Sequence, residues 1–511
     1  MNLINIYISL VKTSLYQTKQ LTLKMIKTIP PVLGFAANTQ HLKPGYLFFA
    51  LKGEKQDGHS FLETAAKKGA NIAVVNQNYQ GPDFGLKLIR VENVLNTLQA
   101  WAKQTLKTKK AKKTQVIGIT GSVGKTTTKE FIATLLDDKY AVEKTPANQN
   151  SQVGLPLSIL NMKKDTKENI KTKKAEVVVL EMGVSQKGEM QTLSEIANVD
   201  VGVITNVALV HAENFKNKEE IFLEKQAIFG KNTKVKIVNF ELLRYFKEKK
   251  ILSFSLKNKE ADYFLEKKSV AKVVTEAVTK DKTVKAGVII FEKGKEIAFF
   301  EEGELFTETH LLEDFLAAFV VARELGLEIA QIKAQVKNLK NEKMRFEKFE
   351  KDQVLFIKDC YNANEKSVVA ALENLPKVKG KTIAVLGEMK ELGKFSKGCH
   401  QRVGKKAFEH VDLLICLGKE SRFMVECFQK EQEKNKIRKI KINENEKDNQ
   451  RKLAQTKHSL KLKKTLEKKA FLFQNKKKLA KFLKSKMQAN DLVLVKGSRS
   501  LEMEKLFDLL F

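Results

Sequence analysis

The chain has few cysteines and no long apolar segment. Its four cysteines include no CxxC pair and no His-spaced metal pattern, so the sequence indicates neither a disulfide framework nor a zinc site. An apolar run from Leu3 to Val11 is too short to span a bilayer, and it lacks both a basic leader and a small-residue cleavage site. We therefore expect a monomeric, cytoplasmic protein without stable membrane insertion.

Acidic residues are also under-represented. The 93 Lys and Arg outnumber the 60 Asp and Glu, which gives a formal charge of +33. Such a charge could signal nucleic acid, an anionic membrane surface or polyphosphate substrates. However, the excess is mostly Lys spread along the whole chain, and no zinc-finger, RNP-like or basic-zipper pattern is present. We interpret the excess as a solvated surface and expect no nucleic-acid partner.

The length of 511 residues predicts two to four domains, and no repeat of fixed period is found. Residues 1–25 are an extension of undefined role. A first domain covers 26–106 and is followed by a charged segment without an apolar period, 107–114, which is typical of a linker. The remaining two domains are predicted at 115–342 and 343–511.

Both later domains alternate short apolar runs with helical patterns, which predicts an α/β fold with mostly parallel sheets covered on both faces. In the central domain the pattern weakens between Lys231 and Glu304, where we expect irregular structure. The C-terminal domain is predicted to be doubly wound and Rossmann-like. Its Lys-rich stretch 429–486 is expected to be a surface insertion with a single strand near 470–473. The predicted strands are 116–119, 177–180 and 201–204 in the central domain, and 354–357, 382–386, 413–417 and 492–495 in the last.

The strongest local signal lies between a predicted strand and a predicted helix, at Gly118-Ile-Thr-Gly-Ser-Val-Gly-Lys-Thr-Thr-Thr128. Glycines allow the backbone to approach phosphates, a helix N-terminus points N–H groups at them, Lys125 neutralises their charge and Thr126 can ligate magnesium. This motif predicts a P-loop that binds a nucleotide. The residues expected to contact the nucleotide are Gly118, Thr120, Gly121, Ser122, Val123, Gly124, Lys125, Thr126 and Thr127.

Three further residues are ambiguous when taken singly. Glu181 ends a buried strand, where a magnesium ligand is expected beside a phosphate loop, but it could equally begin a turn. His211 follows the strand ending at Ile204 and would more often be a packed or exposed histidine. Lys225, on the next predicted helix, would more often be a surface lysine.

The run from Gly118 to Glu130 resembles the ATP loop of the Mur ligases and of their folylpolyglutamate synthetase relatives. The family's next signature is similar to Ala147-Asn-Gln-Asn-Ser-Gln-Val-Gly-Leu-Pro156, and the Glu181, His211 and Lys225 segments then follow in the family's order. The resemblance implies that Lys125 holds ATP phosphates and that Thr126 and Glu181 hold one magnesium ion.

The same resemblance implies a second magnesium ion on His211. Lys225 would be carbamylated, which turns a cation into an anion beside that metal. Lys125, Lys225, His211 and Glu181 are thus the expected catalytic residues. Arg345 and Asp359 are expected to contact ATP, and Asn148 and Asn150 the substrate.

The terminal regions resemble the family members that add D-alanyl-D-alanine to UDP-N-acetylmuramoyl-tripeptide. Three C-terminal motifs carry this likeness, starting at Asp359, Ala384 and Val493, and the region from Thr39 to His59 resembles the family's UDP-sugar-binding domain. Relatives that add diaminopimelate or lysine would have a different signature at 361–364. The implied substrate contacts are Thr39, Asp57, Gly58, His59, Tyr361, Asn362, Asn364, Ser367, Lys496, Ser498 and Arg499, with His400 a weaker candidate.

Some positions depart from the family pattern. Gln40 stands where an Arg is usual in the uridine-nucleotide contact, and Leu311 and Asp314 replace two asparagines of the adenine-side pattern. These changes affect binding more than the chemical core, so we expect activity to be retained. The other departures are Ser151, Gln152 and Ala227.

The resemblance thus implies an ATP- and Mg²⁺-dependent peptide ligase that acts through an acyl phosphate in peptidoglycan precursor synthesis. Three alternatives stay open at this point. The chain could be a Mur-type ligase for another amino acid, a basic nucleic-acid-binding P-loop ATPase, or a non-catalytic homologue.

Overall fold

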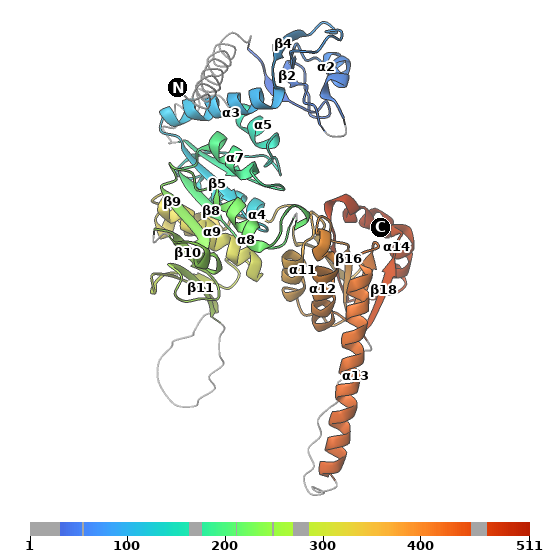
Figure 1. Cartoon of the computed structure of the whole chain (residues 1–511). Helices are drawn as coiled ribbons and strands as arrows, with labels where there is room; N and C mark the ends of the chain where they lie inside the picture. Colours follow the sequence, from blue (N-terminus) through green and yellow to red (C-terminus); the bar gives the residue numbers. More distant parts are fainter. Residues whose placement is uncertain are drawn as a thin grey trace, which may run out of the picture. The chain divides into compact units, whose positions relative to one another are not determined.

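The computed structural model describes residues 31–53, 56–162, 176–210, 212–247, 250–268, 286–450 and 468–511, with no side-chain description for 439–450 (Figure 1). The predicted extension 1–25 and residues 451–467 of the Lys-rich stretch lie outside these ranges. The chain divides into two compact units. One contains an N-terminal and a central sheet, and the other contains the C-terminal sheet together with the short segments 207–221 and 307–311.

The N-terminal sheet has four parallel strands in the order β1-β2-β3-β4. Its inner strands β2 and β3 bury apolar residues on both faces, as expected for a parallel sheet between helices, whereas Leu88 and Ile89 of the edge strand β4 are only half-buried. Asn93 accepts a hydrogen bond from the Asn96 N–H and so caps the long helix that leaves the sheet. The elements are β1 (Gly34–Ala36), β2 (Tyr46–Phe49), η1 (Gly58–Phe61), α2 (Leu62–Lys67), β3 (Ile72–Asn76), β4 (Lys87–Val91) and α3 (Val94–Ala111).

The charged segment 107–114 is helical for most of its length, because α3 continues to Ala111. Lys109 is buried and forms an ion pair with Glu176, and Lys110 lies 2.8 Å from the Asp200 carboxylate. These partners belong to the central sheet region. The segment therefore packs through ion pairs, which an apolar periodicity cannot indicate.

A second helix joins the N-terminal and central sheets. α5 (Gly154–Leu160) lies beside α3, as Figure 1 also shows, and its Leu157 and Leu160 pack on the apolar cluster that includes Trp101. The Trp101 ring packs edge-on against Phe49 of β2, with ring centroids 5.5 Å apart. The two sheets of this unit thus share α3 and α5 as a common packing layer.

The central sheet has nine strands in the order β13-β12-β11-β10-β9-β8-β5-β7-β6. Strands β5 to β11 run parallel, whereas β12 pairs antiparallel with both β11 and β13. The sheet is therefore mostly parallel, as predicted, with an antiparallel edge. The strands are β5 (Gln115–Thr120), β6 (Ala141–Lys144), β7 (Glu176–Glu181), β8 (Val201–Ile204), β9 (Val235–Asn239), β10 (Leu252–Ser255), β11 (Tyr263–Lys268), β12 (Gly287–Glu292) and β13 (Lys295–Glu301).

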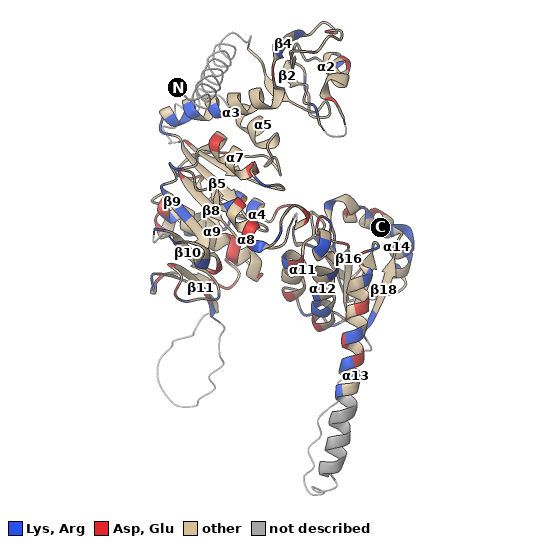
Figure 2. Cartoon of the chain, viewed as in Figure 1, with Lys and Arg blue, Asp and Glu red and all other residues tan. Residues whose placement is uncertain are grey.

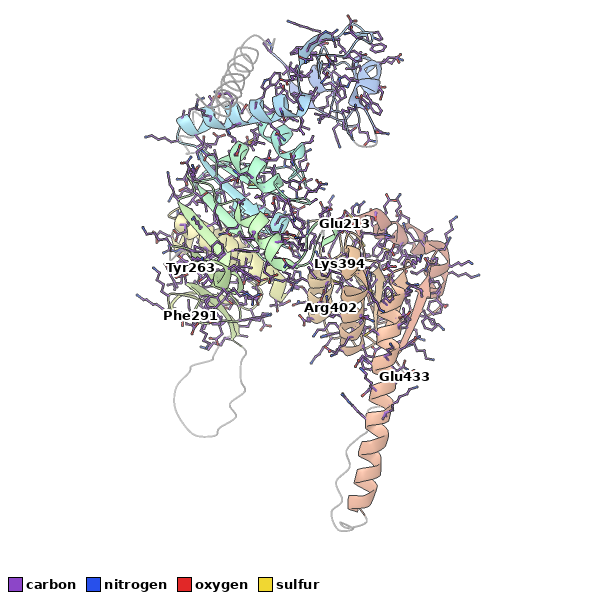
Figure 3. The ribbon with its side chains drawn as sticks, viewed as in Figure 1. Glu213, Tyr263, Phe291, Lys394, Arg402 and Glu433 are labelled. Atoms are coloured by element: carbon purple, nitrogen blue, oxygen red, sulfur yellow. The ribbon has the colours of Figure 1, made fainter. Side chains whose placement is uncertain are left out.

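The prediction of irregular structure between Lys231 and Glu304 was wrong, because β9 to β13 lie in this stretch. Polar residues such as Lys236, Ser253 and Glu266 interrupt the short apolar runs of these strands, so the apolar pattern is broken. On β13, for example, Ala298 and Phe300 are buried while Glu296 is exposed. Figure 3 labels Tyr263 and Phe291, which belong to the antiparallel pair β11 and β12.

Helix α9 (Thr309–Glu324) supplies the most apolar surface of the central core. Its run from Leu312 to Ala322 is almost entirely buried against the strands. Such a helix, apolar on most sides, belongs in an interior. The other elements along this part of the chain are α4 (Lys125–Leu136), α7 (Glu189–Ala197), η2 (Ala212–Asn214), α8 (Lys218–Gln226), η3 (Phe240–Tyr245) and α10 (Ile329–Val336). Of these, η2 and the first residues of α8 lie in the segment 207–221 that belongs to the unit of the C-terminal sheet.

The C-terminal sheet has six strands in the order β14-β15-β19-β16-β17-β18, all parallel except the edge strand β14. All five strands predicted here from sequence are present. The strands are β14 (Glu347–Lys351), β15 (Val354–Asp359), β16 (Thr382–Gly387), β17 (Leu413–Leu417), β18 (Lys469–Phe473) and β19 (Leu492–Lys496). The helices are α11 (Glu365–Glu373), η4 (Gly393–Phe395), α12 (Ser396–His410), α13 (Arg422–Gln450), α14 (Lys476–Lys484), η5 (Arg499–Leu501), η6 (Met503–Leu506) and α15 (Phe507–Leu510).

The stretch 429–486 is only partly an insertion. α13 continues to Gln450, but β18 completes the sheet, and Leu479 and Leu483 of α14 lie in the core. The Lys residues of α14 occupy its outer face. For this reason the Lys-rich composition of the segment did not indicate an amphipathic helix that packs on the core.

Basic positions are spread over all three domains, with acidic ones among them (Figure 2). Among the described residues, only four lysines are buried: Lys109, Lys129, Lys225 and Lys496. No helix in the described ranges combines the length and the apolar character needed to cross a membrane.

Candidate active site

The phosphate loop follows β5 and ends where α4 begins. Gly121 and Gly124 have positive φ values of 153° and 85°. A Cβ on Gly121 would lie 2.0 Å from the Thr205 Oγ1, and one on Gly124 would lie 2.0 Å from the Asp314 Oδ1. Both positions therefore require glycine for conformational and steric reasons. The α4 N-terminus that follows directs N–H groups toward the loop, as an anion site requires.

The end of the neighbouring strand β8 holds this loop in shape. The Val123 N–H donates to Asn206 Oδ1 at 3.0 Å, and Asn206 Nδ2 donates back to the Val123 carbonyl at 2.9 Å. The Thr205 hydroxyl donates to the same carbonyl at 2.6 Å, and the Lys125 ammonium donates to the Gly121 carbonyl at 2.8 Å. Sequence reasoning gave Thr205 and Asn206 no role, although their position after a strand beside the loop was a usable signal.

Thr126 and Glu181, which the resemblance implies hold one magnesium ion, lie in contact. The Thr126 hydroxyl donates to Glu181 Oε2 at 2.9 Å, and Asn150 Nδ2 donates to Glu181 Oε1 at 2.7 Å. Both Thr126 and Glu181 are buried. The structure thus brings the P-loop helix, the end of β7 and the loop before α5 to one carboxylate.

The donor atoms at this point suit one magnesium ion. Within the described ranges no three His, Cys, Asp or Glu side chains cluster as a complete metal cage. Mg²⁺ does not need one, because it commonly takes one or two protein oxygens and completes its shell with phosphate and water. The Glu181 carboxylate and the Thr126 hydroxyl meet that requirement. His211, predicted to hold a second ion, lies outside the described residues.

Lys225 lies near the end of α8 and is buried. Burial, assisted by the charge of Lys125 and opposed by that of Glu224, lowers the pKa of the Lys225 amine to about 7. Glu224 is turned to α7, where it accepts hydrogen bonds from the Gly188 and Met190 N–H groups. An amine with a pKa of about 7 is about half neutral at pH 7, and the neutral form is a nucleophile toward carbon dioxide, which fits the predicted carbamylation.

Lys129 was not predicted as a site residue, yet its side chain is fully buried next to Glu181. Its Nζ donates to the carbonyls of Thr145 and Ala147, at 2.8 and 2.9 Å, and lies 3.8 Å from Glu181 Oε2. The spacing of three residues from Thr126 was the available signal, since it places both on one helix face.

A pocket of about 1270 Å³ lies in the N-terminal domain, and Thr39, Gln40, Asp57, Gly58 and His59 line it. Val153, just before α5, lines it too. The predicted substrate contacts of this domain, together with the departure at Gln40, are thus gathered around one cavity.

His59 builds the pocket wall. Its Nδ1 lies 2.6 Å from Asp57 Oδ1, and its Nε2 accepts the Asn76 N–H at 3.0 Å. The Nδ1 therefore carries the proton, and both ring nitrogens are used within the protein. The His59 backbone N–H is the main cause that lowers the pKa of Asp57. The ring stacks on Tyr79, with centroids 5.2 Å apart.

The loop between β6 and α5 carries the remaining central-domain candidates. Asn148 is exposed, whereas Asn150 faces Glu181. Ser151 Oγ accepts the Gly154 N–H at 3.1 Å, and the Gln152 carbonyl accepts from Gln99 of α3 at 3.2 Å. Ser151 and Gln152 therefore shape the start of α5 and its contact with α3.

In the C-terminal unit, predicted residues meet at the carboxyl edge of β15 and β19. The Lys496 ammonium is buried, lies 2.6 Å from Asp359 Oδ2, and also donates to the Asn362 carbonyl at 3.0 Å. Tyr361 packs under the Arg345 guanidinium, 4.2 Å from its carbon to the ring centroid. A doubly wound sheet binds ligands at this edge.

Ser498 and Arg499 follow β19 and lie at the same edge. Ser498 Oγ donates to the Glu388 carbonyl at 2.8 Å, and Arg499 Nη2 donates to Glu504 at 2.5 Å. The Arg499 N–H also contacts Asn362 Oδ1 at 3.4 Å.

Asn364 and Ser367 have a local structural use. Asn364 Oδ1 accepts the Ser367 N–H at 2.9 Å and the Ser367 hydroxyl accepts the Asn364 N–H at 3.1 Å, which is a capping box at the start of α11. These two side chains thus pair with one another.

His400, the weaker candidate for a substrate contact, does not lie on the protein surface. It is fully buried, its Nε2 accepts the Met389 N–H at 3.0 Å, and its Nδ1 lies 2.7 Å from the Ser396 carbonyl. Burial lowers the pKa of its imidazole. His400 therefore supports the loop after β16 from beneath.

The departures on α9 are buried as well. Leu311 is buried, and the Asp314 carboxylate faces Gly124 and accepts a hydrogen bond from Thr128 at 3.3 Å. Ala227 lies just beyond α8, where its N–H donates to the Glu224 carbonyl. Asp314 is thus a P-loop neighbour that sequence reasoning listed only as a departure.

Comparison with known proteins gives one consistent result. Residues 34–105 match the catalytic domain of the Mur ligase family, 119–319 match the Mur ligase middle domain, and 344–499 match the Mur ligase, glutamate ligase domain. These three matches coincide with the three sheets.

Individual relatives agree. The UDP-N-acetylmuramoyl-tripeptide--D-alanyl-D-alanine ligase of Bacillus subtilis is 32% identical over 416 residues, which cover 79% of this chain and 84% of that protein. The MurF ligase of Thermotoga maritima, solved with ADP, is 27% identical with a TM-score of 0.70, covering 94% of this chain and 98% of that one. MurF of Acinetobacter baumannii has a TM-score of 0.73 at 23% identity, covering 97% and 98%, and supports the fold. The chain belongs to the Mur ligase family.

Proposed function

We propose that this protein joins D-alanyl-D-alanine to UDP-N-acetylmuramoyl-tripeptide with hydrolysis of ATP to ADP and phosphate. Relatives with this named activity align over most of the chain, from Bacillus subtilis at 32% identity to Escherichia coli at 27%. The observation that carries the chemistry is the meeting of Thr126, Asn150 and Glu181 directly behind the phosphate loop.

The first half-reaction is phosphoryl transfer. A carboxylate oxygen of the tripeptide attacks the γ-phosphorus of ATP, ADP leaves, and an acyl phosphate forms. In this role Gly121 to Gly124 surround the phosphates with backbone N–H groups and Lys125 neutralises them. A magnesium ion held by Thr126 and Glu181 would supply charge neutralisation between the phosphates.

The second half-reaction forms the amide. The amine of D-alanyl-D-alanine attacks the acyl carbon, phosphate departs, and the nitrogen loses a proton. Phosphate is a good leaving group at neutral pH, whereas carboxylate oxygen is not. We assign the dipeptide to the carboxyl edge of the C-terminal sheet, where Asn362, Lys496 and Arg499 offer polar groups.

The pocket around Asp57 and His59 is the proposed site for the UDP part of the acceptor. Its volume of about 1270 Å³ is more than enough for a nucleotide-sized ligand. Gln40 replaces the usual cation, so backbone groups and Lys52 would carry more of the diphosphate contact.

The test is phosphate release by purified protein given ATP, Mg²⁺, UDP-N-acetylmuramoyl-tripeptide and D-alanyl-D-alanine, with each omitted in turn. Release that requires both peptide substrates, together with product detection by mass spectrometry, is expected. Release independent of either one overturns the proposal. Replacing D-alanyl-D-alanine by single amino acids tests a Mur-type ligase with another acceptor.

A further inference from the structure

Lys129 stands out among the four buried lysines of the described chain, because it lies beside Glu181 and yet no step of the proposed reaction uses it. It lies on α4, one helical turn after Thr126, and its side chain has no exposed surface. A buried ammonium is costly unless charges and hydrogen bonds compensate it. The partners of Lys129 therefore indicate which part of the structure the buried ammonium stabilises.

Two of these partners belong to the loop 145–150. The Lys129 Nζ donates to the carbonyls of Thr145 and Ala147, at 2.8 and 2.9 Å. Ala147 has a φ of 46°, a left-handed conformation that costs about 1–2 kcal/mol for a residue with a Cβ. Such a conformation persists where surrounding contacts impose it, and two carbonyls converging on one amine are such contacts.

Residues at both ends of the loop 145–150 form hydrogen bonds with Glu181. At the start, the Thr145 hydroxyl accepts the Glu181 N–H at 3.0 Å. At the far end, Asn150 Nδ2 donates to Glu181 Oε1 at 2.7 Å, and the Asn150 carbonyl accepts the Gly183 N–H at 2.9 Å. The orientation of the Glu181 carboxylate thus depends on the course of a loop that Lys129 fixes from inside.

Two acidic side chains lie near the Lys129 ammonium and compensate its buried charge. The Lys129 Nζ lies 3.1 Å from Glu130 Oε1 and 3.8 Å from Glu181 Oε2. The longer distance shows that Lys129 is not a direct hydrogen-bond donor to Glu181. The hydrogen bonds to the two Glu181 oxygens come from Thr126 and Asn150. The Lys129 ammonium therefore places a positive charge near the carboxylate without donating a hydrogen bond to it.

We propose that Lys129 is a positioning residue, which sets the loop 145–150 so that Asn150 and Thr145 aim Glu181 at the metal and phosphates. The loop continues into α5, which packs on the N-terminal core, and Val153 lines the pocket beside Asp57. Lys129 thereby links the geometry of the nucleotide site to the wall of the UDP-sugar pocket. This inference rests on the proposed function for its catalytic readout.

The main test compares Lys129→Met with Lys144→Met. Lys144 is the matched control, because its ammonium also pairs with Glu130, but its side chain is exposed at the end of β6 and is directed to Glu130 rather than to the carbonyls of the loop. We expect Lys129→Met to lower kcat by about a hundredfold, the usual effect of displacing a reactive group by about 1 Å. KM for the UDP-linked tripeptide should rise, and Lys144→Met should stay within about twofold of wild type in both constants.

Two further measurements distinguish positioning from mere stability. The double variant Lys129→Met with Asn150→Ala should lose much less kcat than the product of the two separate fold-losses, because both substitutions act through the same loop. Binding of Mn²⁺–ADP, followed by electron paramagnetic resonance, should weaken at least tenfold in Lys129→Met at a temperature where circular dichroism shows it folded. If Lys129→Met does not fold, Lys129→Gln is measured in the same assays. Its side chain is one bond shorter and uncharged, so it should not reach both carbonyls, and kcat and Mn²⁺–ADP affinity should still fall.

The inference is overturned if the folded variant keeps wild-type kcat and Mn²⁺–ADP affinity, or if its effect multiplies fully with that of Asn150→Ala. Mn²⁺–ADP binding needs neither peptide substrate, so it tests Lys129 even if wild-type protein uses another acceptor. Absence of ligation by wild type would instead contradict the proposed function.

Discussion

The hydroxyl of Thr126 donates a 2.9 Å hydrogen bond to Glu181 Oε2, and this bond joins the first turn of α4 to the end of β7. Both partners are buried, so the bond lies in a medium of low polarity where its geometry is well defined. An ion that inserts here finds a hydroxyl and a carboxylate oxygen already adjacent.

Replacing Glu181 by Gln should therefore lower kcat by about a hundredfold or more, as removal of one transition-state electrostatic contact typically does. The variant should still fold, because glutamine has the same shape. Glu176→Gln is the control, since Glu176 begins the same strand and pairs with Lys109. Steady-state kinetics at several Mg²⁺ concentrations measure the effect, and equal losses in both variants would refute a specific role for Glu181.

Lys225 should form a carbamate. Because the pKa of its amine is about 7, the neutral form is available to carbon dioxide at physiological pH. Protein equilibrated with ¹³C-labelled bicarbonate should give a carbamate carbon signal that Lys225→Met lacks. Activity of Lys225→Ala should be low and partly restored by formate or acetate, which supply the missing carboxylate. A wild-type spectrum without the signal would contradict this prediction.

The same amine predicts how stability depends on pH in carbon dioxide-free buffer. The unfolded chain holds the Lys225 proton up to about its ordinary pKa of 10.5, whereas the folded chain releases it above about pH 7. Protonation therefore favours unfolding, with full effect below pH 7, and this penalty fades as pH rises to 10.5. The Tm advantage of Lys225→Met over wild type should accordingly shrink between pH 7 and 10. A constant difference would show that the amine is not perturbed.

Gly124→Ala should destabilise the protein and abolish nucleotide binding. The new Cβ would meet the Asp314 carboxylate at 2.0 Å in addition to the strain at φ 85°. Gly188→Ala has a similar φ of 83° with no atom within 4 Å, so it isolates the strain of about 1–2 kcal/mol. Overpacking should add about 1–3 kcal/mol at Gly124. Urea unfolding of both variants gives the difference, and Asp314→Ala should recover part of it.

In the C-terminal sheet, Lys496→Met should cost about 3–5 kcal/mol of stability, because it leaves Asp359 without its buried partner. The double variant Lys496→Met with Asp359→Asn should recover much of this loss, since no unpaired charge remains. Circular dichroism during urea titration measures both. A double variant as unstable as the sum of the single ones would show that the two residues act independently.

Much of this fold could be predicted from the sequence because buried parallel strands are continuous apolar runs, as at 177–180 and 492–495. The P-loop and Glu181 were predictable for the same reason, since each directly follows such a run. Strands β9 to β13 were not predicted because polar residues such as Lys236, Ser253 and Glu266 interrupt their apolar runs.

The unpredicted part of the site depends on tertiary contacts. Lys129 is one lysine among many in the sequence, and only the fold brings two carbonyls of a distant loop to its amine. Likewise, nothing local to His400 indicates that a loop covers it, and Asn364 and Ser367 could be read as ligand contacts until their mutual capping bonds are seen.

The chain's single tryptophan lies in the layer that α3 and α5 share between two sheets. Its intrinsic fluorescence is therefore a built-in optical probe of that layer. An emission change on adding UDP-linked substrate would register rearrangement near Val153 and the neighbouring pocket. Tryptophan-detected denaturation would follow the amino-terminal unit, while ellipticity would add the unfolding of the C-terminal sheet, so the two probes together can separate the melting of the two units.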